Sequence, residues 1–253
     1  MMNHTGEHPL DSIRYTTTKT TILDPEMLRN NRVIMGFYND PRADIFRVLR
    51  TNILKQLREN NWNSFAITSA TLGAGKTFVS VNLAIAIAME GNQSVLLVDA
   101  DLRRPSLHKY LGLQEELGLA DYLKGEISLE DILINPGIER LVILPGTSSN
   151  NNASELISSR KMINLIKEIK SRYESRIIIF DIPPIFAADD ALLFMPHVDA
   201  TLLVVEDGKN TTNELQHSMY ILEQTNLLGL VVNKSTQPIP SYQYGYANES
   251  VLT

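Results

Sequence analysis

The chain has 253 residues, of which 43% are hydrophobic and 21% are charged, so it is long enough to bury one substantial core. A net charge of −6 argues against a protein whose main task is to coat nucleic acid, and we expect no nucleic-acid partner. Because cysteine is absent, disulfides, thiolate nucleophiles and Cys-based zinc sites are excluded, which is in keeping with a reducing cytoplasm.

The two ends of the chain differ in composition from its middle. Residues 1–25 are polar and Thr-rich without a clear period, and we assign residues 1–38 to a flexible N-terminal arm, although 24–34 can hold a helical turn. The last residues, 236–253, are rich in Pro, Tyr and Ser and cannot build a core, so we expect a flexible tail. The domain proper is predicted to cover residues 39–235.

The first predicted helix of the domain follows Pro41. Ile45, Leu49, Ile53 and Leu57 recur there at near-helical spacing, which indicates an amphipathic helix with these side chains on its buried face.

From residue 64 onward, strand and helix patterns alternate. The predicted strands are 64–70, 94–101, 140–146, 176–184, 200–208 and 227–234, and the predicted helices are 76–91, 129–134, 153–174, 191–198 and 211–226. The strands are apolar on both faces, as in a parallel sheet covered on each side. The pattern therefore predicts a single α/β domain with a mostly parallel central sheet and helices on both faces.

A glycine-rich loop lies between the strand at 64–70 and the helix at 76–91. It reads Gly73-Ala74-Gly75-Lys76-Thr77, and its glycines would let backbone N–H groups wrap phosphate oxygens at the start of the helix. Lys76 would reach the terminal phosphates of a nucleotide and Thr77 would bind Mg²⁺ through its hydroxyl. Phe78, the next residue, is included among the expected nucleotide contacts. The alternative is a turn that only links strand to helix.

Three acidic residues stand at the ends of predicted strands. Asp99 and Asp101 end the second strand and Asp181 ends the fourth. A buried carboxylate without a cation or a hydrogen-bond donor costs several kcal/mol. One such residue could simply cap a helix, whereas three beside a phosphate loop indicate a site. They supply what phosphoryl transfer needs, namely Mg²⁺ ligands and a base or orienting group for the attacking hydroxyl.

The group that would receive the phosphate is less defined. A serine, a water molecule or a tyrosine could each attack, and the loop does not choose among them. The tail offers Tyr242, Tyr244 and Tyr246 as Y-x-Y-x-Y, although a tail of this composition is also typical of a segment without a specific role.

Three stretches resemble the Walker A, A′ and B motifs of bacterial tyrosine kinases of the polysaccharide-export type. They are ITSATLGAGKTFVSVNLA, VLLVDADLRRPSLH and IIIFDIPP, and the similarity runs from about residue 40 to 235. It is most specific at VDADLRRPSLH and includes GLADYLKGEISLEDIL, ASELISSRKM and VDATLLVVEDG. The segment LDPEMLRNNRVI also resembles the stand-alone members, which lack fused membrane helices.

The resemblance implies an ATP-dependent protein-tyrosine autokinase of the P-loop NTPase fold that regulates exopolysaccharide or capsule biosynthesis and export. Lys76 and Thr77 would grip ATP or ADP and Mg²⁺, Asp99 would orient or deprotonate the tyrosine, and Asp101 and Asp181 would complete the metal environment. Asn233 matches the position where related P-loop ATPases contact adenine.

The resemblance also implies an assembly. A helical E-x-x-R-x-x-R motif of the family packs against the active site of a neighbouring subunit in a ring, and Asp44, Arg47 and Arg50 stand in register with it. Asp44 replaces the usual Glu, and the alternative is a solvated helix face. In a ring, the tail tyrosines would be phosphorylated in trans.

Partners and location follow from the same resemblance. We expect an activating segment of a membrane polysaccharide co-polymerase and a cognate phosphotyrosine phosphatase. The start of the chain lacks a secretory signal and the apolar run 81–89 is too short to cross a bilayer, so a cytoplasmic protein recruited to the membrane through a partner is expected.

Departures from the family keep two alternatives open. Leu72 and Ala74 stand where the family prefers Pro and Glu, and only three tyrosines are closely spaced in the tail, so a weakly catalytic, nucleotide-gated scaffold is one alternative. The other is a positioning ATPase of the MinD/ParA-like class. Thr71 argues against it, because that class carries a signature Lys there.

Overall fold

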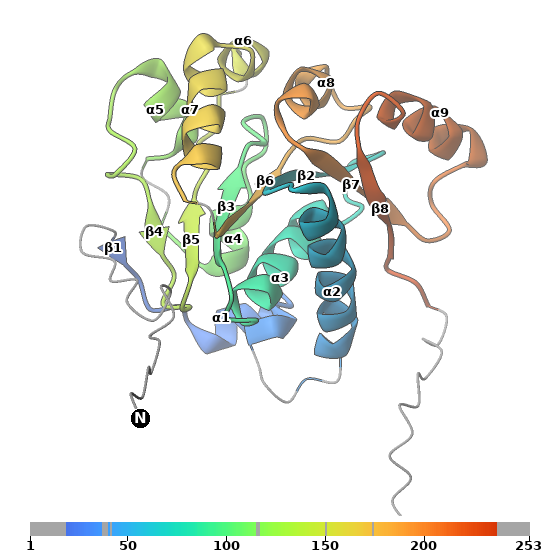
Figure 1. The fold of residues 1–253 in the computed structure, drawn as a ribbon, viewed down its shortest axis with the longest axis horizontal. Helices are drawn as coiled ribbons and strands as arrows, with labels where there is room; N and C mark the ends of the chain where they lie inside the picture. The colour runs from blue at the N-terminus through green and yellow to red at the C-terminus, as the bar shows by residue number, and fades with distance from the viewer. Residues whose placement is uncertain are drawn as a thin grey trace, which may run out of the picture.

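A sheet of eight strands forms the centre of the part of the chain that the computed structural model describes, residues 19–36, 40, 42–114, 117–149, 151–173 and 175–236 (Figure 1). The strands are β1 (Lys19–Thr20), β2 (Ser64–Ser69), β3 (Ser94–Asp99), β4 (Ile134–Asn135), β5 (Leu141–Leu144), β6 (Arg176–Asp181), β7 (Ala200–Glu206) and β8 (Leu227–Asn233). Their order is β1-β4-β5-β3-β6-β2-β7-β8, and only the β4–β5 pair is antiparallel. The predicted mostly parallel sheet is confirmed.

Helices cover both faces of this sheet, as predicted (Figure 1). The α-helices are α1 (Pro25–Asn30), α2 (Ala43–Asn60), α3 (Lys76–Ala88), α4 (Leu107–Leu111), α5 (Leu119–Lys124), α6 (Ala153–Ile157), α7 (Arg160–Ser171), α8 (Asp190–Phe194) and α9 (Thr212–Leu222), with 3₁₀ turns η1 (Ile34–Gly36) and η2 (Met195–His197). Helices α1–α4 share one apolar core with the sheet and α5–α9 share the other.

The strands divide their side chains between the two cores by simple alternation. In β3, Val95 and Leu97 join the core under α1–α4, whereas Leu96 and Val98 join the core under α5–α9. Because successive side chains of a strand point to opposite faces, a fully apolar strand can serve two helical layers at once.

Helix α2 forms where the sequence predicts it, but its buried face is rotated. Phe46 is buried together with Ile53 and Leu57, whereas Ile45 is 44% exposed and Val48 is 50% exposed. The T-shaped contact between the rings of Phe46 and the α3 residue Phe78, at 5.6 Å, sets this orientation.

Residues 19–36 form defined structure, which differs from the flexible arm predicted for residues 1–38. Asp24 caps α1 by accepting a hydrogen bond from the Glu26 N–H, and Leu28 and Val33 are buried under α3 and α4. Burial of these apolar side chains stabilises the segment, so the arm prediction was wrong for this part of it. Residues 1–18 and the tail from 237 lie outside the described residues.

Two predicted helices differ in detail. Residues 130–132 form a turn instead of a helix, and the Ser128 hydroxyl donates to the Asp131 carboxylate at 2.6 Å beside it. The helix predicted over 153–174 is divided into α6 and α7 at Ser158 and Ser159. Ser159 has an extended backbone and accepts a hydrogen bond from the Met162 N–H, which makes it the N-cap of a new helix.

None of the helices in the described ranges combines the length and the apolar character needed to cross a bilayer.

Candidate nucleotide site

The parallel strands bring the predicted site residues to one edge of the sheet. Asp99 at the end of β3 lies in register with Asp181 at the end of β6, and β2, which leads into the glycine-rich loop, is the next strand beyond β6. Ligands of open parallel sheets bind at this carboxyl edge.

The glycine-rich loop is shaped by two glycines with left-handed backbone angles, Gly73 at φ +81° and Gly75 at φ +96°. Asn233, at the end of β8, donates from its side-chain amide to the Ala74 carbonyl at 2.8 Å. A Cβ on Gly75 would lie 2.1 Å from that amide nitrogen, so only glycine fits at this position. Asn233 therefore holds the loop from a strand distant in sequence.

Lys76 points into a cluster of carboxylates. Its Nζ lies 2.9 Å from Asp101 and 3.5 Å from Asp181, and its side chain is 11% exposed. Burial by itself would lower the pKa of Lys76, but the charges of Asp181, Asp101 and Asp99 outweigh it and raise the pKa above the usual value. Lys76 is therefore a fixed positive charge at the start of α3.

Asp181 is fully buried and accepts from two hydroxyls on α3. Thr77 donates to one carboxylate oxygen at 2.6 Å and Ser80 donates to the other at 3.2 Å, while Ser106 approaches the Thr77 hydroxyl at 3.0 Å. Burial raises the pKa of Asp181, and the charge of Lys76 and the bond from Thr77 oppose that rise. The sequence analysis did not single out Ser80 or Ser106, although Ser80 follows Lys76 by one helical turn.

Asp99 is held by the backbone at the start of α4. The N–H groups of Ser106 and Leu107 donate to one of its oxygens at 2.8 and 2.9 Å. Burial, with the charge of Asp181, raises the pKa of Asp99 to about 7, against the opposing effect of Lys76 and these two bonds. A carboxyl group with such a pKa is suited to accept and release a proton near neutral pH.

The donor set fits a magnesium nucleotide better than a metal held by the protein alone. No group of three or more His, Cys, Asp or Glu side chains in the described residues is arranged to hold a metal ion. The Thr77 hydroxyl and the Asp181 carboxylate are adjacent oxygen donors, and Mg²⁺ is usually held by one or two carboxylates together with water and substrate phosphates. Asp99 and Asp101, also predicted as metal ligands, direct oxygens to N–H groups and to Lys76.

Phe78 was expected to contact the nucleotide, but its ring packs against Phe46 of α2. The described geometry therefore gives its side chain a role in joining α2 to α3.

The sequence analysis did not predict the ion-pair network that lies beside the acidic cluster. Arg103, two residues after Asp101, donates to both oxygens of the buried Asp190 at 2.5 and 3.2 Å and to the Ser154 hydroxyl at 2.9 Å. The hydrogen bond to Asp190 raises the pKa of Arg103, against the opposing effect of burial. The network ties the loop after β3 to α6 and α8, which lie next to each other at the same edge (Figure 1).

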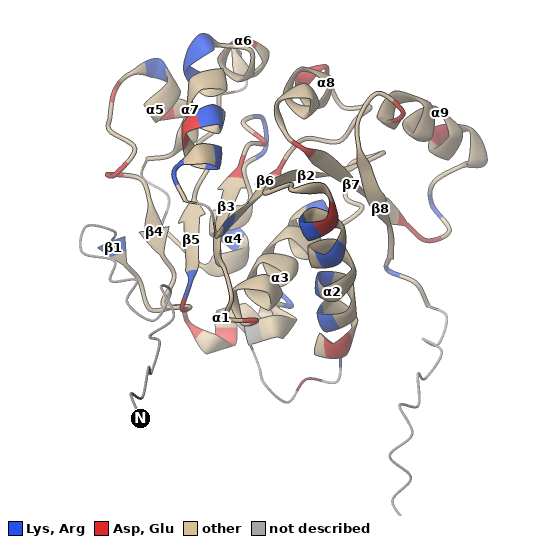
Figure 2. Cartoon of the chain, viewed as in Figure 1, with Lys and Arg blue, Asp and Glu red and all other residues tan. Residues whose placement is uncertain are grey.

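The residues predicted for subunit contact lie on α2, where charged residues gather along the helix (Figure 2). Asp44 and Arg47 form an ion pair on its outer side. Arg50 differs, because its guanidinium donates to the Ala86 carbonyl of α3 at 3.2 Å within the same chain. The structure thus brings Asp44 and Arg47 together at the surface and directs Arg50 inward. Tyr242, Tyr244 and Tyr246 lie outside the described residues.

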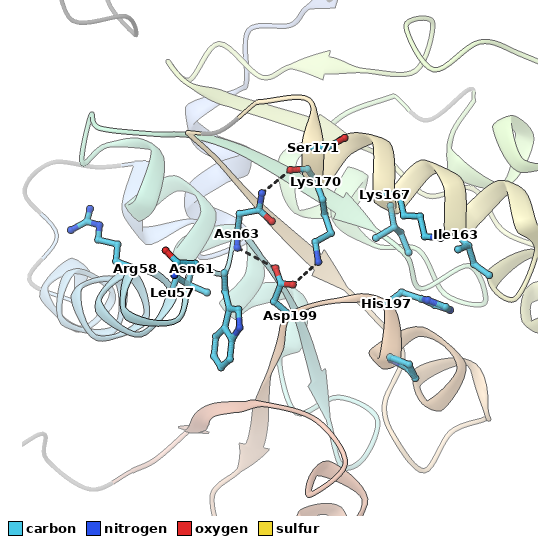
Figure 3. Close-up of a pocket in the computed structure, with 13 residues that line it drawn as sticks. Leu57, Arg58, Asn61, Asn63, Ile163, Lys167, Lys170, Ser171, His197 and Asp199 are labelled. Carbon is cyan, nitrogen blue, oxygen red and sulfur yellow. Dashed lines mark hydrogen bonds and ion pairs between the residues drawn. The ribbon is translucent and has the colours of Figure 1, made fainter.

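A cavity of about 900 Å³ lies at the opposite, amino-terminal edge of the sheet, away from the glycine-rich loop (Figure 3). Asp199 lies on its wall between Asn63 and Lys170, and it accepts hydrogen bonds from Lys170 at 2.5 Å and from the Ser64 hydroxyl at 2.7 Å. These contacts satisfy the carboxylate and join α7 to the start of β2 and β7.

Comparison with known proteins gives a consistent set of relatives. A family model described as an AAA domain matches residues 63–227. The chain is 32% identical over 212 residues to the putative tyrosine-protein kinase EpsB of Ralstonia nicotianae, covering 83% of this chain and 28% of EpsB. It is 32% identical over 221 residues to the tyrosine-protein kinase YwqD of Bacillus subtilis, covering 87% of this chain and 92% of YwqD. The chain thus spans under a third of the first relative and nearly all of the second.

Solved structures agree in fold. The chimerical protein CapA2B2 gives a TM-score of 0.76 at 30% identity, covering 87% of this chain and 94% of that one. The kinase domain of the Escherichia coli tyrosine kinase ETK gives 0.73 at 32% identity, covering 94% and 91%. The septum site-determining protein MinD of Pyrococcus horikoshii, complexed with Mg-ADP, gives 0.58 at 27% identity, covering 71% and 74%.

Proposed function

Because the chain belongs to the family of bacterial tyrosine-protein kinases, we propose that it transfers the terminal phosphate of ATP to protein tyrosine with the help of Mg²⁺. The biological role proposed with it is regulation of exopolysaccharide or capsule biosynthesis and export. The observation that carries the proposal is the arrangement of Lys76, Asp99, Asp101 and Asp181 around the glycine-rich loop at the carboxyl edge of the sheet.

Each residue of the cluster has a distinct part in this proposal. Lys76 holds the terminal phosphates, and the backbone N–H groups at the start of α3 hold the phosphate oxygens beside it. Thr77 and Asp181 would supply oxygen ligands to Mg²⁺, which would offset negative charge on the transferred phosphate. Asn233 keeps the loop in place, and its side-chain oxygen, which accepts no hydrogen bond from the described part of the chain, would accept one from an amino group of the base.

Asp99 is the proposed base for the attacking tyrosine. Its burial and the N–H groups of Ser106 and Leu107 fix the carboxylate, and its raised pKa allows it to take the phenolic proton as the phosphate is transferred. The proposed acceptors are Tyr242, Tyr244 and Tyr246 of a neighbouring copy.

The outer face of α2 is the proposed subunit contact. The exposed apolar side chains Ile45 and Val48 lie next to the Asp44–Arg47 pair, and exposed apolar groups rimmed by charge are typical of contact surfaces. Light scattering tests the assignment: Arg47→Ala should give a smaller species. Arg50→Ala is the matched control, because its contact lies within the chain, and an unchanged mass for Arg47→Ala would contradict the proposal.

Two further partners belong to this proposal, an activating segment of a membrane polysaccharide co-polymerase and a phosphotyrosine phosphatase. They would place the protein at the cytoplasmic face of the membrane. Fractionation of cells with and without the co-polymerase tests this placement, and a membrane fraction that does not depend on that partner would contradict it.

Phosphorylation mapping tests the activity. Purified protein is incubated with Mg·ATP, and phosphate is located by mass spectrometry in the wild type, in Lys76→Met and in the triple Tyr242/Tyr244/Tyr246→Phe variant. We expect phosphate on the tail of the wild type and none in Lys76→Met. Rapid ATP hydrolysis without phosphotyrosine would favour a positioning ATPase, and neither activity would favour a nucleotide-gated scaffold.

A further inference from the structure

The loop between β7 and α9, residues 207–211, contacts the residues that lead into the glycine-rich loop. There Thr71 stands in place of the signature Lys of the MinD/ParA-like class. Asn210 donates from its side-chain amide to the Thr71 hydroxyl at 3.1 Å, and the Lys209 ammonium lies 3.5 Å from the Leu72 carbonyl. The same ammonium lies 3.8 Å from the position that a Cβ on Gly73 would occupy. A second lysine, from another element than Lys76, is therefore placed over the first half of the phosphate loop.

The position of Lys209 is set by its own loop. The Asn210 side-chain oxygen accepts from the Glu206 N–H at 3.1 Å, which closes the turn after β7. Glu206 then forms ion pairs with Lys209 at 3.1 Å and with Lys234 at 3.2 Å. The hydrogen bond from Lys209, with that from Lys234, lowers the pKa of Glu206, so this carboxylate is ionised at neutral pH.

The charges around Lys209 leave it available to an anion. One carboxylate is shared between two lysines, so Glu206, Lys209 and Lys234 together keep one net positive charge, while the Asp207 carboxylate of the same loop accepts from the Ser235 hydroxyl. The floor of the site is acidic, because the carboxyl groups of Asp99, Asp101 and Asp181 surround the single ammonium of Lys76. Because Lys76 is already paired with Asp101 and Asp181, a bound polyphosphate would gain from a second positive charge at the rim.

We propose that Lys209 is a phosphate-binding residue that contacts the terminal phosphate and so favours a nucleoside triphosphate over a diphosphate. Lys209 would thus supply a positive charge from the same chain, in place of the signature Lys that Thr71 replaces. Its side chain is half-exposed and its contact with Leu72 is long, so it can turn from the carbonyl to a phosphate oxygen without breaking a buried bond. The inference rests on the proposed function, since it assumes that the loop binds a nucleotide.

Nucleotide affinities test the assignment. Dissociation constants are measured by equilibrium dialysis with Mg²⁺ for ADP and for the β,γ-imido analogue of ATP, in the wild type and in Lys209→Met. We expect the triphosphate affinity to fall by about tenfold, the size of one charge-assisted hydrogen bond, and the ADP affinity to change by less than about twofold. Lys209→Arg should keep most of the preference, because it keeps the charge.

Lys167→Met is the control. It removes a lysine that lines the cavity at the opposite, amino-terminal edge of the sheet, so it should change both affinities by less than about twofold. An equal loss of ADP and triphosphate in Lys209→Met would show a role in loop structure and overturn the assignment, as would an unchanged triphosphate affinity. Failure of the wild type to bind either nucleotide would instead refute the proposed function itself, and the assignment with it.

Discussion

Asp199→Asn is predicted to destabilise the protein although it lies far from the nucleotide site. One oxygen of Asp199 accepts from Lys170 and the other accepts from the Ser64 hydroxyl and from the N–H groups of Ser64 and Asn63. An asparagine has one acceptor oxygen and one NH₂ group, so in either orientation its NH₂ faces donors. Hydrogen bonds to charged groups are worth about 1.5–3 kcal/mol, and partial exposure reduces this, so we expect a loss of about 2 kcal/mol at pH 7.

The shifted pKa of Asp199 decides how this loss of stability depends on pH. Burial raises the pKa of Asp199, but the bonds from Lys170 and Ser64 outweigh it, so the folded protein holds this pKa below the usual value. A depressed carboxyl pKa contributes stability above the pKa of the unfolded chain, and that contribution is lost as the pH falls through the folded value. The difference between wild type and variant should therefore shrink below about pH 4.

Urea unfolding provides the assay. Trp62 is the single tryptophan of the chain and lines the same cavity, so its fluorescence reports the transition. Glu59→Gln is the control, since Glu59 pairs with Lys55 at 3.9 Å with both side chains mostly exposed, and it should stay within about 0.5 kcal/mol. A loss below about 0.5 kcal/mol in Asp199→Asn at pH 7, or a gap that widens in acid, would refute the reasoning.

Three further substitutions have defined outcomes. Ser159→Ala removes the N-cap of α7 and should cost about 1 kcal/mol in thermal unfolding, and an unchanged midpoint would contradict the cap. Gly75→Ala should weaken ADP binding more than tenfold, because the added methyl group meets the Asn233 side chain and the backbone φ is positive. Adding Asn233→Ala should relieve the contact with the methyl group but not the backbone strain. Unchanged ADP binding in the single variant would exclude the clash. Phe180→Ala, fully buried with its ring 4.9 Å from that of Phe194, should cost about 4 kcal/mol in urea unfolding, and a loss under 1 kcal/mol would count against this packing.

The sequence predicts the sheet and the phosphate loop well because both depend on local pattern. Apolar strands ending in acids, such as the one that ends at Asp99, are typical of a parallel sheet covered on both faces, and parallel order then brings Asp181 beside Asp99. The glycines at 73 and 75 indicate the loop directly, because their backbone angles suit few other residues.

What the sequence did not predict depends on contacts between distant segments. The pair of Arg103 with Asp190 joins residues 87 positions apart, and Lys209 reaches Leu72 across 137 positions, so neither leaves a local signal. The division of 153–174 follows from Ser159 acting as a cap, which is visible only once its backbone is extended. The orientation of α2 was misjudged because Ile45 and Phe46 are both apolar, and only packing against Phe78 decides which is buried.

The central claim is that one copy of the chain phosphorylates tail tyrosines of another. The most direct measurement mixes Lys76→Met, which retains its tyrosines, with the Tyr242/Tyr244/Tyr246→Phe variant, which retains its site, and adds Mg·ATP. The two chains differ in mass, so mass spectrometry assigns each phosphate to its chain. We expect phosphate on the tail of Lys76→Met in the mixture and none when that variant is incubated alone. If the wild type phosphorylates its own tail but Lys76→Met stays unmodified in the mixture, phosphorylation between copies is contradicted.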